Sequence, residues 1–226
     1  MRIIVTAGPT REHLDPVRFL SNPSTGKMGF ALAAEAAKRG HEVVLVAGPV
    51  ALKTPKGVKR IDVVSAREML AAVKSAVGDS KRTTARETVL IATAAVADWR
   101  PAKCAKTKLK KTQMSGVLKL VRNPDILKTI GSCRRRSKAV WLRLVGFAAE
   151  TDHVLDEAAR KCREKGLSFI VANDVTKKGC GFGTDTNRVT FVFPDGTQKR
   201  FPLMTKRRVA REILKEVEHG APSKLG

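Results

Sequence analysis

The chain contains no tyrosine, and phenylalanine and tryptophan together supply only 4% of its 226 residues. Because stacking platforms for single-stranded nucleic acid need aromatic side chains, nucleic-acid binding ranks low, despite 44 Lys and Arg against 21 Asp and Glu. The chain also lacks an apolar run near the roughly 20 residues of a membrane helix. Its first residues have no secretory h-region. We therefore expect a cytoplasmic protein with no membrane association.

Cysteine and histidine are also scarce. The four cysteines and four histidines are scattered, with no C-x-x-C pair and no neighbours at metal-ligand spacing. Free thiols are favoured over disulfides or a zinc site, and no protein metal site is assigned. A hydrophobic content of 42% excludes a disordered chain. We expect a single domain over residues 1–226, with 220–226 as a frayed tail.

Short apolar runs alternate with helical patterns, which is typical of an α/β fold with a mostly parallel sheet flanked by helices. Strands are expected at residues 3–7, 43–47, 59–64, 89–97, 117–121, 139–147 and 169–172. Helices are expected at 28–37, at 69–77 behind a Ser65–Glu68 capping box, from Asn123, after Asp152, and over 205–219. Residues 89–97 are the most apolar and predict the central strand. Residues 188–193 and 198–203 predict a C-terminal β-hairpin.

A candidate anion site lies at the start of the first predicted helix. Residues 22–29 follow a strand and a long loop of irregular pattern up to about Thr25, and a helix N-terminus there would offer free N–H groups and the helix dipole. The segment is not a P-loop, because Met28 follows Lys27 where Ser or Thr is needed. Gly26 and Gly29 supply only the end of a dinucleotide fingerprint. A packed turn without ligand stays an alternative.

Other candidates lie in loops and on one helix. Arg18 and Asn22 share the long loop after the first strand, where α/β proteins place functional residues. Residues 103–111 are rich in lysine without any period and predict a mobile basic flap, although most such runs are solvated charge. A lysine of this flap could stabilise charge on a triphosphate under attack. Lys161 and Lys165 present either a solvated helix face or a pair of phosphate contacts.

Short motifs in the same order along the chain carry a resemblance that covers nearly its whole length. They are Thr6–Glu12, Leu14–Arg18, Ser21–Asn22, Gly26–Gly29, Ala94–Asp98, Lys108–Lys111, Asn123–Ile126, Gly146–Thr151, Ala172–Asp174, and Gly181–Phe182 with Asp185 and Asn187. With these motifs the sequence resembles phosphopantothenate–cysteine ligase, the synthetase half of the bacterial bifunctional coenzyme A biosynthesis flavoprotein.

The resemblance implies a Rossmann-like homodimer that joins 4′-phosphopantothenate to L-cysteine with CTP. The carboxylate attacks the α-phosphate of CTP and releases pyrophosphate; the cysteine amine then attacks the acyl-cytidylate and expels CMP. Mg²⁺ is expected to be carried by the nucleotide phosphates. The flavin-binding half has no counterpart here, so we expect neither flavin nor decarboxylase activity, and a separate decarboxylase chain stays open as a partner.

The resemblance also implies residue roles. Arg18, Asn22 and Ala95 would bind the phosphopantothenoyl part, and Asn22 would serve the acyl-cytidylate intermediate. Lys108 would be the catalytic cation of the first half-reaction. The expected nucleotide-binding residues are Ala92, Thr93, Ala94, Asp98, Lys108, Pro124, Asp125, Ile126, Leu127, Phe147, Lys161 and Lys165.

Two other functions stay open at this point. An NAD(P)-dependent reductase would suit the first βαβ unit, but the chain lacks a G-x-G start and any tyrosine. A basic nucleic-acid-binding module would suit the net charge of +23, with Lys206, Arg207 and Arg208 of the terminal helix against phosphates. The sequence does not decide between CTP and ATP. The β-hairpin over residues 188–203 is a candidate dimer surface, because an exposed edge strand invites pairing.

Overall fold

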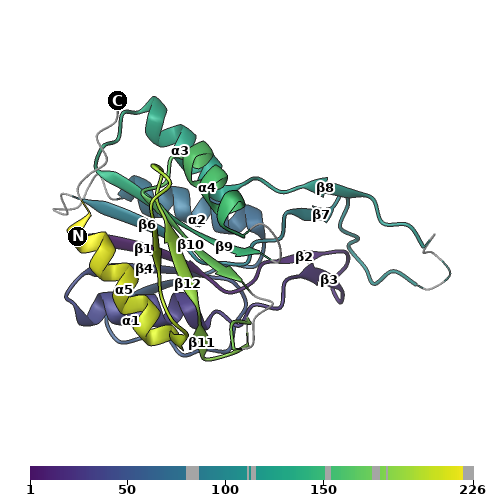
Figure 1. Ribbon diagram of the computed structural model, residues 1–226. Coiled ribbons are helices and arrows are strands. Elements are labelled where there is room, and N and C mark those ends of the chain that lie inside the picture. Colours follow the sequence, from purple (N-terminus) through teal and green to yellow (C-terminus); the bar gives the residue numbers. More distant parts are fainter. Residues whose placement is uncertain are drawn as a thin grey trace.

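The computed structural model describes residues 1–79, 87–110, 112, 116–150, 154–174, 179–181 and 183–220. Within them, eight strands form one sheet in the order β13-β12-β10-β9-β6-β1-β4-β5 (Figure 1). All neighbours from β10 to β5 are parallel, and β12 and β13 are antiparallel. The strands are β1 (Arg2–Ala7), β4 (Glu42–Ala47), β5 (Val58–Asp62), β6 (Thr88–Ala92), β9 (Leu142–Glu150), β10 (Phe169–Asp174), β12 (Val189–Val192) and β13 (Gln198–Arg200).

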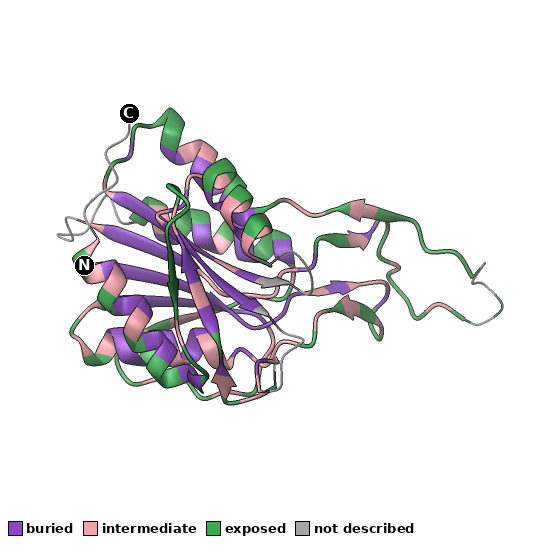
Figure 2. Ribbon diagram, viewed as in Figure 1, coloured by how far each residue is buried: buried purple, intermediate pink, exposed green. Residues whose placement is uncertain are grey.

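Helices cover both faces of this sheet, so its inner strands are apolar on both sides. On one face Ile3 and Val5 of β1 pack with α1 (Lys27–Lys38) and α5 (Lys206–His219). On the other face Ile4 packs with α2 (Ala66–Asp79), α3 (Ile126–Arg136) and α4 (Val154–Lys165). Figure 2 shows the buried strands between the two helix layers. The expected α/β sheet, with β6 in its middle, is confirmed.

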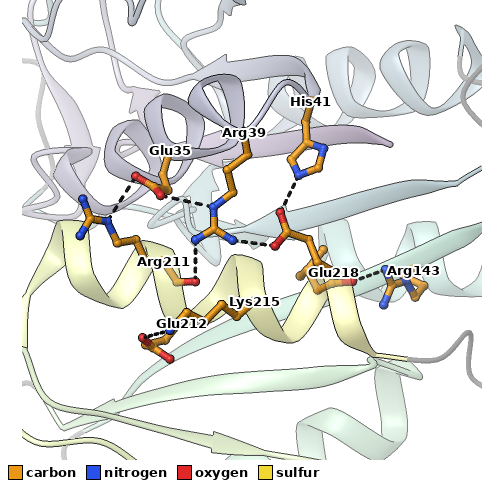
Figure 3. Close-up of polar contacts among 9 residues, drawn as sticks. Glu35, Arg39, His41, Arg143, Arg211, Glu212, Lys215 and Glu218 are labelled. Atoms are coloured by element: carbon orange, nitrogen blue, oxygen red, sulfur yellow. Dashed lines mark hydrogen bonds and ion pairs between the residues drawn. The ribbon is translucent and has the colours of Figure 1, made fainter.

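A charged cluster fastens the last helix to the first (Figure 3). Arg39, next to the end of α1, donates to Glu218 of α5 over 2.6 Å and to Glu35 over 3.3 Å. His41 Nε2 lies 2.8 Å from the other Glu218 oxygen, and Arg211 lies 3.6 Å from Glu35. The helices run side by side, so both begin at the edge of the sheet where the parallel strands end.

Two short hairpins project from that edge, to the right in Figure 1. One pairs β2 (Arg11–His13) with β3 (Phe19–Ser21), and the other pairs β7 (Trp99–Pro101) with β8 (Leu120–Arg122). We call residues 11–21 the first arm and the described residues of 99–122 the second arm. They correct three expectations: the long loop before Thr25 contains a hairpin, the region after Asp98 starts with a strand, and the strand expected at 117–121 begins at Leu120.

The strand expected at residues 89–97 is also shorter, because β6 ends at Ala92. Beyond it the backbone turns across the end of β1, where Ala95 N donates to Gly8 O over 2.9 Å and Thr10 N donates to Ala95 O over 3.4 Å. The helix expected from Asn123 begins at Ile126, since Asp125 is its N-cap and accepts from Lys128 N over 2.9 Å.

Two smaller expectations are confirmed. Ser65 and Glu68 form the capping box of α2, and β12 and β13 form the C-terminal hairpin. The four cysteines, all within the described residues, form no disulfide, and burial raises the pKa of Cys162 to about 11. In the part of the chain that the structure describes, no helix is long and apolar enough to cross a membrane. Asp152, Lys111 and the tail beyond Gly220 lie outside the described residues.

Candidate functional site

A cavity of about 440 Å³ opens where the parallel strands end, between the starts of α1 and α3. Such a position, outside the carboxyl ends of the strands, is the usual ligand site of open α/β sheets. The predicted site residues that line it are Asn22, Ala92, Thr93, Ala94, Ala95, Asp98, Pro124, Asp125, Ile126, Leu127, Phe147 and Lys165. Three others that the structure describes, Arg18, Lys108 and Lys161, are not part of this lining.

The start of α1 forms one wall of the cavity. Its N-cap, Gly26, has a left-handed backbone with φ of 77°, no side chain caps the helix, and its first turn holds no acidic residue. Its first N–H groups are therefore left for a ligand, as in anion sites at helix starts. Gly29 lets this turn approach the sheet, since a Cβ there would lie 2.5 Å from Ala7 Cβ and 2.6 Å from Thr93 Oγ1.

Residues 93–97 form the floor of the cavity and are fastened to β1. Thr93 Oγ1 donates to Thr6 O over 2.6 Å, and Ala94 N donates to Thr6 Oγ1 over 3.2 Å. Asn22 reaches the same loop, where its Nδ2 donates to Ala95 O over 3.2 Å and to Val96 O over 3.3 Å. Two residues assigned to the phosphopantothenoyl part, Asn22 and Ala95, thus lie in contact, and the amide of Asn22 is held at the cavity wall.

The start of α3 forms the opposite wall. Lys165, at the end of α4, lies 2.7 Å from Asp125 Oδ2, and the other Asp125 oxygen caps α3. Burial alone would raise the pKa of Asp125, but hydrogen bonds from Lys128 N and Lys165 outweigh burial and lower it. Asp125 is therefore a carboxylate at neutral pH. Lys161 lies one turn earlier on α4 and is half-buried, outside the cavity lining.

The arms hold the remaining predicted residues. Arg18 donates to Asp15 through Nε over 3.0 Å and through Nη2 over 2.6 Å, and Nη2 also donates to Leu109 O over 3.0 Å. The hydrogen bonds that Asp15 accepts from Arg18, together with those from Val17 N and Leu109 N, hold the pKa of its buried carboxyl well below its usual range. Lys108, beside Leu109, is exposed. Arg18 and the Lys108 segment therefore lie together, away from the cavity.

Sequence reasoning missed part of the lining. Lys27, Asn173, Asn187 and Lys206 also face the cavity. Asn173 and Asn187 stand in motifs of the resemblance without a predicted role, and Lys27 stands in the candidate anion site of residues 22–29 without a role of its own. Lys206 was predicted only as a contact of the terminal helix to nucleic-acid phosphates, whereas the structure buries it in the cavity lining.

The sheet and cavity together define an α/β protein with a Rossmann-like parallel sheet and a ligand site at the carboxyl ends of its strands. Comparison with known proteins is consistent with this class. Residues 1–220 match the family described as DNA/pantothenate metabolism flavoprotein C-terminal domain. The chain belongs to this family.

Curated relatives agree with the family. The coenzyme A biosynthesis bifunctional protein CoaBC of Bacillus subtilis is 46% identical over 216 residues, which are 95% of this chain and 50% of the relative. The protein of the same name from Escherichia coli is 44% identical over 220 residues, which are 96% of this chain and 51% of the relative. The chain thus spans about half the length of the curated relatives it matches.

Solved structures share the fold. The crystal structure of the C-terminal domain of CoaBC superposes with a TM-score of 0.77 at 44% identity, covering 96% of this chain and 93% of that one. A mutant of Cab2 in complex with phosphopantothenate-cysteine has a TM-score of 0.72 at 16% identity, covering 96% of this chain and 86% of that one. At such low identity the second likeness concerns the fold alone.

Proposed function

We propose that this chain is a phosphopantothenate–cysteine ligase, which joins 4′-phosphopantothenate to L-cysteine with CTP through an acyl-cytidylate. The observation that carries the proposal is that twelve of the fifteen residues given nucleotide or acyl roles by the resemblance line one cavity, although they come from segments far apart in the sequence. Membership of the family and the likeness to the CoaBC C-terminal domain support it. The nucleic-acid-binding module does not explain this cavity, and the reductase lacks a G-x-G start and any tyrosine.

The geometry suits an acyl transfer in two steps. The nucleoside would bind by the start of α3, with Asp98 and Phe147 beside it, and the phosphates would extend toward the start of α1. Asn22 lies between these walls, at the end of β6. There its amide can bind the mixed anhydride and orient the acyl group for the cysteine amine. Donors placed before reaction stabilise the charge that develops at phosphorus.

Mg²⁺ would enter on the nucleotide. Mg²⁺ commonly binds through substrate phosphates and keeps several waters. Among the described residues, no group of three or more His, Cys, Asp or Glu side chains could hold a metal ion. The charge of Mg²⁺ would partly neutralise the triphosphate, and the start of α1 and the lysines of the protein would stabilise the remaining negative charge.

Lys108 lies outside the lining of the cavity in its own subunit. We propose a homodimer in which an arm of one subunit brings Lys108 to the cavity of the other. The arms expose the large apolar side chains Val17, Phe19, Trp99 and Leu120, and exposed apolar patches of this kind mark interfaces. The edge strand β13, with all three residues exposed, is the alternative surface expected from the sequence.

The activity is tested with the whole chain, 4′-phosphopantothenate, L-cysteine, Mg²⁺ and either CTP or ATP. We expect pyrophosphate and CMP in equal amounts with CTP, and no pyrophosphate when phosphopantothenate is left out. Pyrophosphate release with ATP and not with CTP would show that ATP is the nucleotide substrate. No pyrophosphate with either nucleotide would overturn the proposal. A thermal-unfolding titration separates the alternatives, because CTP and not NADH should raise the midpoint.

A further inference from the structure

The cavity crosses the edge of the sheet, and its two sides differ in charge. On the side of α3 and α4, Lys165 is paired with the carboxylate of Asp125. On the side of α1 and α5 there are two ammonium groups, Lys27 and Lys206, with Asp185 as the carboxylate beside them. Neither lysine received a role from the resemblance. Counted over the described side chains, this side is therefore the more cationic end of the cavity.

Lys206 is an unusual lysine because only 6% of it is exposed. It is the first residue of α5, and Thr205 caps that helix by accepting from Arg208 N. Its Nζ donates to Thr184 O over 2.5 Å and to Gly181 O over 3.5 Å. Backbone carbonyls thus hold the ammonium group in the cavity wall, and long lysines are rarely buried without a function or a partner.

The charges around Lys206 favour an anion. Burial and the neighbouring Lys27 lower the pKa of Lys206, and Asp185 opposes them. Asp185 is already paired with Lys27 over 2.7 Å and is largely exposed. Among the side chains that the structure describes, Lys27 and Lys206 both lie beside the Asp185 carboxylate, at a helix start that attracts negative charge. A bound anion would balance this excess.

Two buried amides give an independent sign of a ligand. Asn173 is 8% exposed and Asn187 is 5% exposed, and both line the cavity. Their Oδ1 atoms have no hydrogen-bond partner within the described part of the chain, although Asn173 Nδ2 donates to Cys180 O over 2.9 Å. Buried polar atoms are nearly always satisfied. Unsatisfied ones in a cavity wall indicate groups that bind a ligand or its waters.

We propose that Lys206, together with Lys27 and the start of α1, binds the two terminal phosphates of the nucleoside triphosphate. This inference rests on the proposed function and deepens it. In the first half-reaction a bond forms from the carboxylate oxygen to the α-phosphorus. The bond from that phosphorus to the bridging oxygen breaks, and its electron pair leaves on pyrophosphate. Lys206 and Lys27 stabilise that leaving charge, while Asn173 and Asn187 accept hydrogen bonds from waters around the phosphates.

The test compares Lys206→Met with the wild-type chain in titrations of CTP, CMP and inorganic pyrophosphate. We expect CTP and pyrophosphate to bind about tenfold weaker or more, as for the loss of a charge-assisted hydrogen bond. CMP should bind unchanged, because it lacks the terminal phosphates. Lys215→Met is the matched control, since Lys215 lies on the same helix but pairs at the surface with Glu212.

Lys27→Met keeps the test decisive if the buried substitution prevents folding, because the Lys27 side chain is 36% exposed. This variant should bind CTP and pyrophosphate more weakly than the wild type and bind CMP with unchanged affinity. If the folded variants bind CTP and CMP with the wild-type ratio, the inference is overturned while the ligase proposal stands. If the wild-type chain binds pyrophosphate through Lys206 but forms no acyl-cytidylate, the phosphate site stands and the ligase proposal fails.

Discussion

Arg18 donates through both Nε and Nη2 to one oxygen of Asp15, Oδ2, inside the first arm, and the same guanidinium donates to the carbonyl of Leu109, next to Lys108. Leu109 N donates to Asp15 in return, and Ala105 N donates to Leu14 O over 2.8 Å. The segment that carries Lys108 is therefore fastened to the arm formed by β2 and β3. The residue expected to bind substrate also orders the segment of the expected catalytic lysine.

Asp15→Asn tests this connection. The carboxylate uses both of its oxygens, because Oδ2 accepts from the Arg18 side chain and Leu109 N while Oδ1 accepts from Val17 N and Arg18 N. An amide has only one acceptor oxygen, so it cannot serve both sets of donors. We expect trypsin to cleave between Lys103 and Lys110 several times faster, and pyrophosphate release to slow. Asp195→Asn is the control, because that carboxylate caps the turn between β12 and β13. Equal cleavage rates in both variants would show that Asp15 does not order the segment.

The pH dependence of this effect follows from the lowered pKa of Asp15. A carboxyl whose folded pKa is depressed contributes stability above its unfolded pKa, and loses it only as pH falls through the folded value. The difference in unfolding free energy between the wild type and Asp15→Asn should therefore stay constant from about pH 5 to 8. A difference that shrinks within this range would contradict the ion pair.

The shared site of a homodimer predicts complementation. Lys108→Gln should block pyrophosphate release, and Asn22→Asp should let the acyl-cytidylate form and stall. If Lys108 serves the partner's cavity, a mixed dimer of the two variants has one cavity with both changes and one with neither. Random mixing should then restore about a quarter of wild-type activity. No restoration, after subunit exchange is shown by native mass spectrometry, would place Lys108 over its own cavity.

The sequence predicted the sheet well because its inner strands are buried on both faces. Continuous apolar runs such as residues 89–92 have few alternatives, and the Ser65–Glu68 spacing identified the start of α2. The strands of the arms were not predicted, because they lack such continuous apolar runs. Their strands have three residues each and mixed exposure, and β7 pairs with β8 across a loop of no recognisable period. Pairing of that kind is set by tertiary contacts.

The site was predicted where motifs are local and missed where the fold joins distant parts. Asn22 and Asp125 stand in quoted motifs and line the cavity. Lys206 stands in a basic run with Arg207 and Arg208, which is typical of a surface helix. Its inward position depends on how α5 packs on α1, and no pattern within the helix distinguishes the buried lysine from its exposed neighbours.

Glu218→Gln tests the cluster that fastens α5 to α1. Burial opposes ionisation of Glu218, but hydrogen bonds from His41 and Arg39 outweigh it and lower its pKa. Its stabilising effect is thus complete above the unfolded pKa and is lost as pH falls through the folded value. We expect the variant to lose about 1 kcal/mol of unfolding free energy at pH 7, and the difference to vanish well below about pH 4. Glu212→Gln, in a single pair with the exposed Lys215, should change stability by less than about 0.5 kcal/mol.

Gly29→Ala tests whether the close approach of α1 to the sheet builds the anion wall. The new Cβ would meet Ala7 Cβ at 2.5 Å and Thr93 Oγ1 at 2.6 Å, and Ala7 belongs to a buried strand that cannot yield easily. Overpacking of this kind costs about 1–3 kcal/mol, against a gain of up to about 1 kcal/mol in helix propensity. We expect a net loss of stability.

The matched control is Gly78→Ala in α2, where a Cβ would meet nothing within 4 Å. It gains helix propensity without a clash, so its unfolding midpoint should stay the same or rise. Because Gly29→Ala also displaces the first turn of α1, CTP should bind more weakly to it, whereas Gly78→Ala should bind CTP as the wild type does. Calorimetry and CTP titration of the two folded variants check both parts. Unchanged CTP affinity in a destabilised Gly29→Ala would mean that the start of α1 packs against the sheet without contacting the phosphates.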